Sequence, residues 1–315
     1  MATDGLLSPS DVRALAAELA LLPTKRLGQN FMIDSNTVRR IVRLAGVGAG
    51  DVVLEIGPGL GSLTLGLLDS GASVLAVEID HRLASLLPRT IGARRPDVAG
   101  RLGVVVGDAM RLPLPVALSV PQPGAQAVAE PAAHAGSARR LAPEPRSPSF
   151  MVANLPYNIA VPVLLRILAD QPSVQRCLVL VQAEVGDRLA ANPGSRSYGA
   201  PSVKLQWYGA ARLAGDVPAS VFWPRPRVES KLVAFQRGAP PATASSRTTV
   251  FDCVDAAFNQ RRKTLRQALQ QWAGSATAAS EVLELAHVDG AVRGEVLTID
   301  DFGRISDARA ALIAT

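Results

Sequence analysis

The tetrad Asn154-Leu155-Pro156-Tyr157 carries groups that suit a flat ring bearing an amino group. The Asn154 side-chain oxygen and the Leu155 carbonyl can each accept one N–H of the amine. Pro156 fixes the turn, and the ring of Tyr157 can stack on the ligand. An aromatic amine is a poor nucleophile because its lone pair is delocalised, and two acceptors direct that lone pair outward. The tetrad therefore predicts group transfer to an amine by placement and preorganisation, without a general base before the attack; an ordinary Asn-Pro turn is the alternative.

A glycine-rich segment, Glu55-Ile-Gly-Pro-Gly-Leu-Gly61, lies upstream between an apolar run and a helical stretch that starts near Ser62. Its glycines allow the backbone to turn tightly and to approach a ligand closely. A dinucleotide site expects G-x-G-x-x-G, whereas this spacing is G-x-G-x-G. With an acid before it, the segment resembles the first motif of class I methyltransferases; a purely structural turn is the alternative.

Two acidic residues follow the next two apolar runs. Glu78 stands 21 residues after Gly57, where a carboxylate can accept hydrogen bonds from both hydroxyls of a ribose, although nicotinamide enzymes use an acid at the same place. Asp108, in Gly107-Asp108-Ala109, can accept from the amino group of an adenine ring, although this tripeptide is common in ordinary turns. The glycine-rich segment and the tetrad, in this order along the chain, together indicate methyl transfer from S-adenosylmethionine to the amino nitrogen of an adenine.

The elements that must position these residues form an α/β pattern. Short apolar runs alternate with helical stretches, which predicts a doubly wound sheet with helices on both faces. Ligands of such sheets bind beyond the carboxyl ends of the strands, where every motif above falls. The predicted strands are Val52–Ile56, Val74–Ile79, Leu102–Val106, Phe150–Ala153 and Leu178–Val181.

Helices are predicted at both ends of the chain. Near the N-terminus we expect a helix over Asp11–Leu21 capped by Ser10, and a second over Ser35–Leu44. An Ala/Pro-rich stretch, Val116–Ser149, interrupts the α/β pattern, and Gly238–Thr249 has the composition of a linker. The remainder, Val250–Thr315, is helical in pattern.

Composition narrows the class of protein. The chain has 315 residues, 48% of them hydrophobic, a formal charge of +6 and a pI of about 9.9, which favours a polyanionic partner. Two cysteines provide neither a disulfide framework nor a metal quartet, and we expect no metal. Asp4 and Glu18 argue against a signal peptide, and no uncharged apolar run reaches the roughly 18 residues of a membrane span. These features predict a soluble cytoplasmic protein.

The motifs resemble those of the ribosomal RNA adenine N6,N6-dimethyltransferases, the bacterial small-subunit enzymes in particular. Five further stretches share this resemblance, which therefore extends from about Lys25 to Arg266: Lys25–Phe31, Gln182–Arg188, Tyr198–Gln206, Phe222–Ser230 and Phe258–Arg266. Two departures stand out. Position 32 is usually Leu and is Met here, and the 116–149 stretch is longer than usual, either as a solvated insertion or as a feature that alters contact with RNA.

The resemblance implies the site residues. Residues expected to bind S-adenosyl-L-methionine are Asn30, Met32, Gly57, Gly59, Glu78, Ile79, Asp108, Ala109 and Asn154. Residues expected to hold the target adenine are Asn154, Leu155, Tyr157 and Phe222. A basic cluster could contact RNA phosphates from one side of a helix, with a solvated helix face as the alternative: Arg261, Arg262, Lys263 and Arg266.

The expected activity is dimethylation of adenine N6 on two adjacent adenosines in the 3′-terminal hairpin loop of 16S ribosomal RNA, within the small subunit or its precursor, by a monomer. Alternatives are a resistance-type methyltransferase of 23S ribosomal RNA and a ribosome-assembly binding factor; a nicotinamide oxidoreductase fits worst. The expected organisation is an N-terminal helical extension (1–24), a methyltransferase domain (25–238) with the 116–149 insertion, a linker (239–249) and a helical RNA-contacting domain (250–315).

Overall fold

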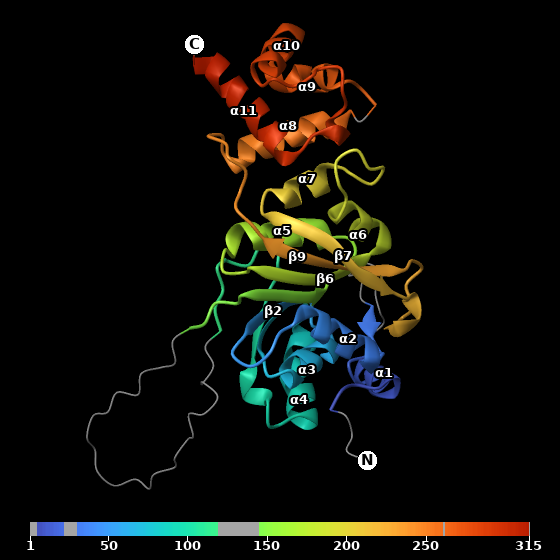
Figure 1. Ribbon diagram of the computed structural model, residues 1–315. Coiled ribbons are helices and arrows are strands. Elements are labelled where there is room, and N and C mark those ends of the chain that lie inside the picture. Colours follow the sequence, from blue (N-terminus) through green and yellow to red (C-terminus); the bar gives the residue numbers. More distant parts are fainter. Residues whose placement is uncertain (1–4, 22–29, 119–144, 261, 315) are drawn as a thin grey trace, which may run out of the picture. The chain divides into compact units, whose positions relative to one another are not determined.

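A computed structural model describes residues 5–21, 30–118, 145–260 and 262–314 (Figure 1). The chain divides into two compact units. The first comprises Met1–Val179 with Pro218–Arg227, and the second comprises Leu180–Val217 with Val228–Thr315. The predicted boundary near residue 238 and the predicted linker stay predictions. Within the described ranges, no helix is both long and apolar enough to cross a membrane.

The described residues form one seven-stranded sheet with the strand order β4-β3-β2-β5-β6-β9-β7. β2 pairs in parallel with β3 and with β5, β3 pairs in parallel with β4, and β7 pairs antiparallel with β9. The predicted doubly wound α/β fold is therefore confirmed. The strands are β2 (Val52–Ile56), β3 (Ser73–Glu78), β4 (Leu102–Val106), β5 (Phe150–Asn154), β6 (Arg176–Gln182), β7 (Gly209–Val217) and β9 (Ser230–Arg237).

Burial explains the apolar runs of the central strands. Every residue of β2 and β3 is buried, as expected for strands that are covered on both faces. All five predicted strands are confirmed, with ends that shift by up to two residues. β7 and β9 lie outside the predicted strands, and in β7 most residues are exposed or half-buried, so this strand has no continuous apolar run.

Helices of the first unit flank these strands (Figure 1): α1 (Pro9–Glu18), α2 (Ser35–Ala45), α3 (Ser62–Asp69), α4 (His81–Arg94) and α5 (Ala160–Asp170). The predicted cap of the first helix is wrong. Ser8 is the N-cap instead, because its side chain accepts from the Asp11 N–H while the Asp11 carboxylate accepts from the Ser8 N–H. Pro9 takes the first helical position, where its missing N–H costs nothing.

A two-stranded sheet completes the first unit. β1 (Phe31–Met32) pairs antiparallel with β8 (Phe222–Trp223), so that Met32 lies opposite Phe222. The predicted insertion at 116–149 lies mostly outside the described residues. At its described ends, Leu118 and Arg146 exchange two backbone hydrogen bonds of 2.9 Å.

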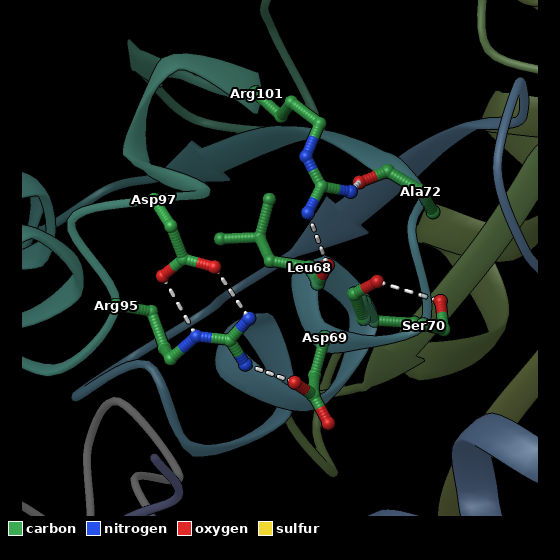
Figure 2. A network of polar contacts seen from close by, with 8 residues as sticks. Leu68, Asp69, Ser70, Ala72, Arg95, Asp97 and Arg101 are labelled. Carbon is green, nitrogen blue, oxygen red and sulfur yellow. Dashed lines mark hydrogen bonds and ion pairs between the residues drawn. The ribbon is translucent and has the colours of Figure 1, made fainter. Parts of the chain in front are cut away.

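Polar contacts close the C-terminal end of α3 (Figure 2). The Arg101 guanidinium donates to the carbonyls of Leu68 and Ala72, each at 2.8 Å. The last carbonyls of a helix have no partner within the helix, and a cation is favourable at this end of the helix dipole. Arg95 forms a two-pronged ion pair with Asp97 beside them.

Helices of the second unit pack around one hydrophobic core. Tyr198 and Val203 belong to the same buried cluster as Phe302, so α7 shares its core with the C-terminal helices. α8 begins within the stretch predicted as a linker, after the N-cap Ser246. The helices are α6 (Ala183–Leu189), α7 (Ala200–Gln206), α8 (Arg247–Asn259), α9 (Leu265–Ala273), α10 (Ala276–Leu285) and α11 (Ile299–Ala314).

We predict that Tyr198→Phe lowers the free energy of unfolding by about 1–2 kcal/mol, because the buried Leu297 carbonyl loses its donor. The Tyr198 hydroxyl donates to that carbonyl at 2.8 Å, and burial raises its pKa, so it remains protonated. Urea unfolding measures the change. An unchanged midpoint would contradict the assigned hydrogen bond.

Candidate active site

A cavity in the first unit lies at the carboxyl ends of β2, β3, β4 and β5. Parallel strands end at the same edge of a sheet, so residues far apart in the sequence meet here. The structure brings together all nine residues that were expected to bind the cofactor: Asn30, Met32, Gly57, Gly59, Glu78, Ile79, Asp108, Ala109 and Asn154. Leu155 and Tyr157 also line the cavity.

The glycine-rich turn between β2 and α3 forms one wall of the cavity. Gly59 has a φ of +57°, a conformation that side chains disfavour, and a Cβ there would lie 3.1 Å from the ring of Phe31. Gly61 has a φ of +94°, and a Cβ there would lie 2.8 Å from the Leu87 side chain of α4. The positive φ at both positions favours glycine, and the absence of a Cβ lets the turn approach Phe31 of β1 and Leu87 of α4 closely.

Glu78 lies at the end of β3 with its carboxylate held in place. It accepts hydrogen bonds from the Gly59 N–H at 3.2 Å and from the Asp80 N–H at 3.0 Å. Burial, which leaves Glu78 only 5% exposed, raises its pKa. Each oxygen keeps a second lone pair, so the fixed carboxylate can still accept hydrogen bonds from a ribose.

Glu55, the acid that precedes the glycines of the motif, also lines the cavity, although it was not among the residues expected to bind the cofactor. It is 1% exposed, and the Thr64 hydroxyl of α3 donates to its Oε2 at 2.7 Å. Burial, with a smaller contribution from the nearby Glu78 charge, raises its pKa to about 8. The sequence could have indicated Glu55 as a site residue, because it is a single acid inside an otherwise apolar strand, where a charge is costly to bury.

The acidic lining suits a ligand with positive charge, ribose hydroxyls and a purine. Glu78 and Asp108 supply carboxyl groups, Glu55 supplies a carboxyl that is mostly protonated at neutral pH, and Met32 and Ile79 supply apolar contact. S-adenosylmethionine has all of these features, so the residues fit it. Within the described ranges, no group of three or more His, Cys, Asp or Glu side chains is arranged to hold a metal ion.

The tetrad follows β5, and one hydrogen bond sets the orientation of its amide. Asn154 Nδ2 donates to the Asn30 carbonyl at 3.1 Å, which leaves Asn154 Oδ1 as the acceptor. Leu155 has a buried side chain, and Tyr157 is half-buried. The turn therefore presents an oriented amide oxygen and an aromatic ring to the same cavity.

The structure does not bring Phe222 to this cavity. Its side chain is 2% exposed, and it is not among the described residues that line the cavity. On the neighbouring strand, Phe31 does line the cavity and stacks on Trp223, with ring centroids 6.4 Å apart and an interplanar angle of 25°. The expected clamping role of Phe222 stays a prediction.

The basic cluster is not one helix face, and that expectation is wrong. α8 ends at Asn259, and α9 begins at Leu265, whose N–H donates to the Val292 carbonyl at 2.7 Å. Arg262 and Lys263 are exposed in the turn between these helices, and Arg266 is exposed on α9. Arg261 lies outside the described residues. RNA contact by the cluster stays a prediction.

We predict that Glu55→Gln removes a pH-dependent loss of stability. The raised pKa means that, between about pH 4.5 and pH 8, the folded chain keeps a proton that the unfolded chain has lost. Wild-type stability therefore falls as the pH rises through this window, and glutamine, which mimics the protonated carboxyl, avoids this loss. Urea unfolding should show the variant gaining on the order of 4 kcal/mol over the wild type by pH 8. Parallel pH profiles of the two proteins would refute the assignment.

Comparison with known proteins identifies the family. The model of the ribosomal RNA adenine dimethylase family matches residues 22–307. The ribosomal RNA small subunit methyltransferase A of Streptomyces avermitilis is 52% identical over 311 residues, 98% of this chain and 96% of the relative. The protein of the same name in Thermobifida fusca is 53% identical over 304 residues, 96% of each chain.

Two solved structures share the fold. A dimethyladenosine transferase from Plasmodium falciparum has a TM-score of 0.66 at 20% identity and covers 87% of this chain and 95% of its own. A 23S rRNA methyltransferase, ErmE, has a TM-score of 0.58 at 22% identity and covers 89% of this chain and 100% of its own. The sheet is thus the Rossmann-like sheet of class I methyltransferases. With 286 of its residues spanned by the family model, from 22 to 307, the chain belongs to the ribosomal RNA adenine dimethylase family.

Proposed function

We propose that this chain uses S-adenosyl-L-methionine to dimethylate adenine N6 on two adjacent adenosines in the 3′-terminal hairpin loop of 16S ribosomal RNA. The observation that carries the proposal is the oriented Asn154 amide in a cavity that also holds Glu78 and the glycine-rich turn. Family membership and the names of the relatives support the reaction and the small-subunit substrate. A cytoplasmic location and a monomeric state are part of the same proposal.

The proposed roles follow from the groups in the cavity. When bound, the cofactor supplies a methyl group on a sulfonium, which is electrophilic. In the first transfer, Asn154 Oδ1 and the Leu155 carbonyl would accept the two N–H groups of the adenine amine and direct its lone pair toward the methyl. The nitrogen, made acidic by the new bond, then loses one proton to solvent, and one N–H remains to be accepted in the second transfer. Tyr157 stacks on the base, and Glu78 accepts hydrogen bonds from the ribose of the cofactor. A base in a hairpin loop is already partly unstacked, so it can be splayed into such a site.

The proposed binding of RNA depends on the exposed basic turn of the second unit. Arg262, Lys263 and Arg266 carry side chains long enough to reach phosphates, and phosphate contacts provide salt-dependent affinity. The overall formal charge of +6 favours the same polyanionic partner. A binding factor for ribosome assembly would use this surface as well. Methyl transfer to the RNA is therefore what distinguishes an enzyme from a binding factor.

We predict that Asn154→Ala lowers methyl transfer by at least about 100-fold, as for loss of one preorganised polar contact to the reacting group, while cofactor affinity changes much less. Transfer of labelled methyl groups into unmethylated small subunits, with large subunits alongside, measures the effect, and mass spectrometry locates the label. Asn158→Ala is the matched control, because Asn158 is exposed in the same turn and does not line the cavity.

Three outcomes would contradict the proposal in different ways. Near-normal turnover by Asn154→Ala would overturn the role of the amide. Label in the large-subunit RNA would place the enzyme with the resistance-type methyltransferases. No label from the wild type in either subunit, with the cofactor still bound, would favour a binding factor.

We predict that reversing charge at Arg262 and Lys263 weakens RNA binding and lowers the slope of log affinity against log salt by about 2. Titration of the hairpin RNA at several salt concentrations gives the slope. The matched control reverses Arg212 and Arg293, two exposed arginines of the second unit outside the cluster. Equal salt slopes for the cluster variant and the control would mean that the cluster is an ordinary solvated surface that does not contact RNA phosphates.

A further inference from the structure

We infer that Arg166 of α5 is a positioning residue that holds the loop after β4 in the shape the cofactor site needs. This inference rests on the proposed function. The loop, residues 107–112, contributes Gly107, Asp108 and Ala109 to the cavity. Arg166 does not line the cavity, so it acts on the ligand through the loop.

The Arg166 guanidinium joins α5 to both ends of this turn. It donates one hydrogen bond to the Ala109 carbonyl and another, of 2.5 Å, to the Leu112 carbonyl. Its Nε also lies 3.4 Å from the Asp170 carboxylate, one helical turn later. The side chain is only 20% exposed, so solvent competes little for these bonds.

The loop needs this support because of its place in the sheet. β4 is the first strand of the order, so among the described strands only β3 pairs with it. Beyond the strand, some backbone N–H groups of the loop find acceptors within the loop. Asp108 Oδ1 accepts from the Met110 N–H at 2.8 Å, and the Asp108 carbonyl accepts from the Leu112 N–H at 2.7 Å. These bonds shape the turn internally. The Arg166 guanidinium provides bonds that fix it against a neighbouring helix.

α5 also begins directly after the Asn154–Tyr157 tetrad, with its first residue at Ala160. Arg166 therefore connects the loop expected to face the purine of the cofactor with the helix that follows the tetrad. The planar fork of arginine can donate to two carbonyls at once, whereas a lysine ammonium is a point charge on a flexible stem. The two bonds thus demand arginine specifically.

The test uses Arg166→Met, which keeps an apolar stem and loses every donor. We expect the Kd for S-adenosylmethionine, measured by calorimetry, to rise about tenfold or more, while kcat at saturating cofactor changes less than twofold. Hydrogen exchange should quicken in residues 107–112. Arg166→Lys should recover only part of the affinity, and thermal unfolding of each variant shows that it is folded.

Arg101→Met is the matched control, because Arg101 likewise donates two hydrogen bonds to backbone carbonyls, those of Leu68 and Ala72 (Figure 2). Neither of these residues lines the cavity. We expect this variant to lose stability but to keep its Kd within twofold. An unchanged Kd in Arg166→Met, or an equal rise in both variants, would overturn the inference. Absence of cofactor binding by the wild type would overturn the proposed function and this inference with it.

Discussion

The parallel pairing of β2 with both β3 and β5 is the constraint on which the site depends. It brings the glycine-rich turn, the Glu78 carboxylate and the Asn154 turn to one edge of the sheet from separate parts of the sequence. Parallel strands require long crossover connections, and here α3 and α4 cover the strands within those connections. The strands can be mostly apolar because both faces are covered, and their polar groups lie at or near the strand ends.

Two buried carboxyl groups at this edge oppose the stability of the fold. Glu55 is nearly inaccessible and contacts a hydroxyl, and Glu78 is held by backbone N–H groups. Burial disfavours the charged form of each, and the nearby Glu78 charge further disfavours ionisation of Glu55. Because its pKa is about 8, Glu55 is mostly protonated at neutral pH, so a neutral carboxyl lies in the core beside Glu78.

More of the candidate site than of the surrounding fold could be predicted from the sequence. Continuous apolar runs marked the strands of the parallel part, and the rule that ligands bind at strand ends pointed to the glycine-rich turn, Glu78, Asp108 and the tetrad. The full set of nine residues expected to bind the cofactor came from the family resemblance. β7 and β9 were not predicted, because an antiparallel strand with mixed exposure has no continuous apolar run. β7 is also interrupted by a bulge between Leu213 and Gly215. The break between α8 and α9 was missed because the sequence pattern is helical on both sides of it; Leu265, the first residue of α9, donates its N–H to the Val292 carbonyl instead of continuing α8. Arg166 was missed because its partners are backbone carbonyls, which no side-chain pattern reveals.

The Asn30–Asn154 hydrogen bond has a consequence for which residue type can occupy position 154. Aspartate is the stronger acceptor of the two, but its carboxylate would place a second oxygen at hydrogen-bond distance from the Asn30 carbonyl. Two oxygens without a proton between them repel each other, so an acid here would turn away or take up a proton. An amide avoids this conflict because one end donates to the main chain while the other can accept a hydrogen bond in the cavity. The choice of asparagine thus follows from the need for both polarities on a single planar group.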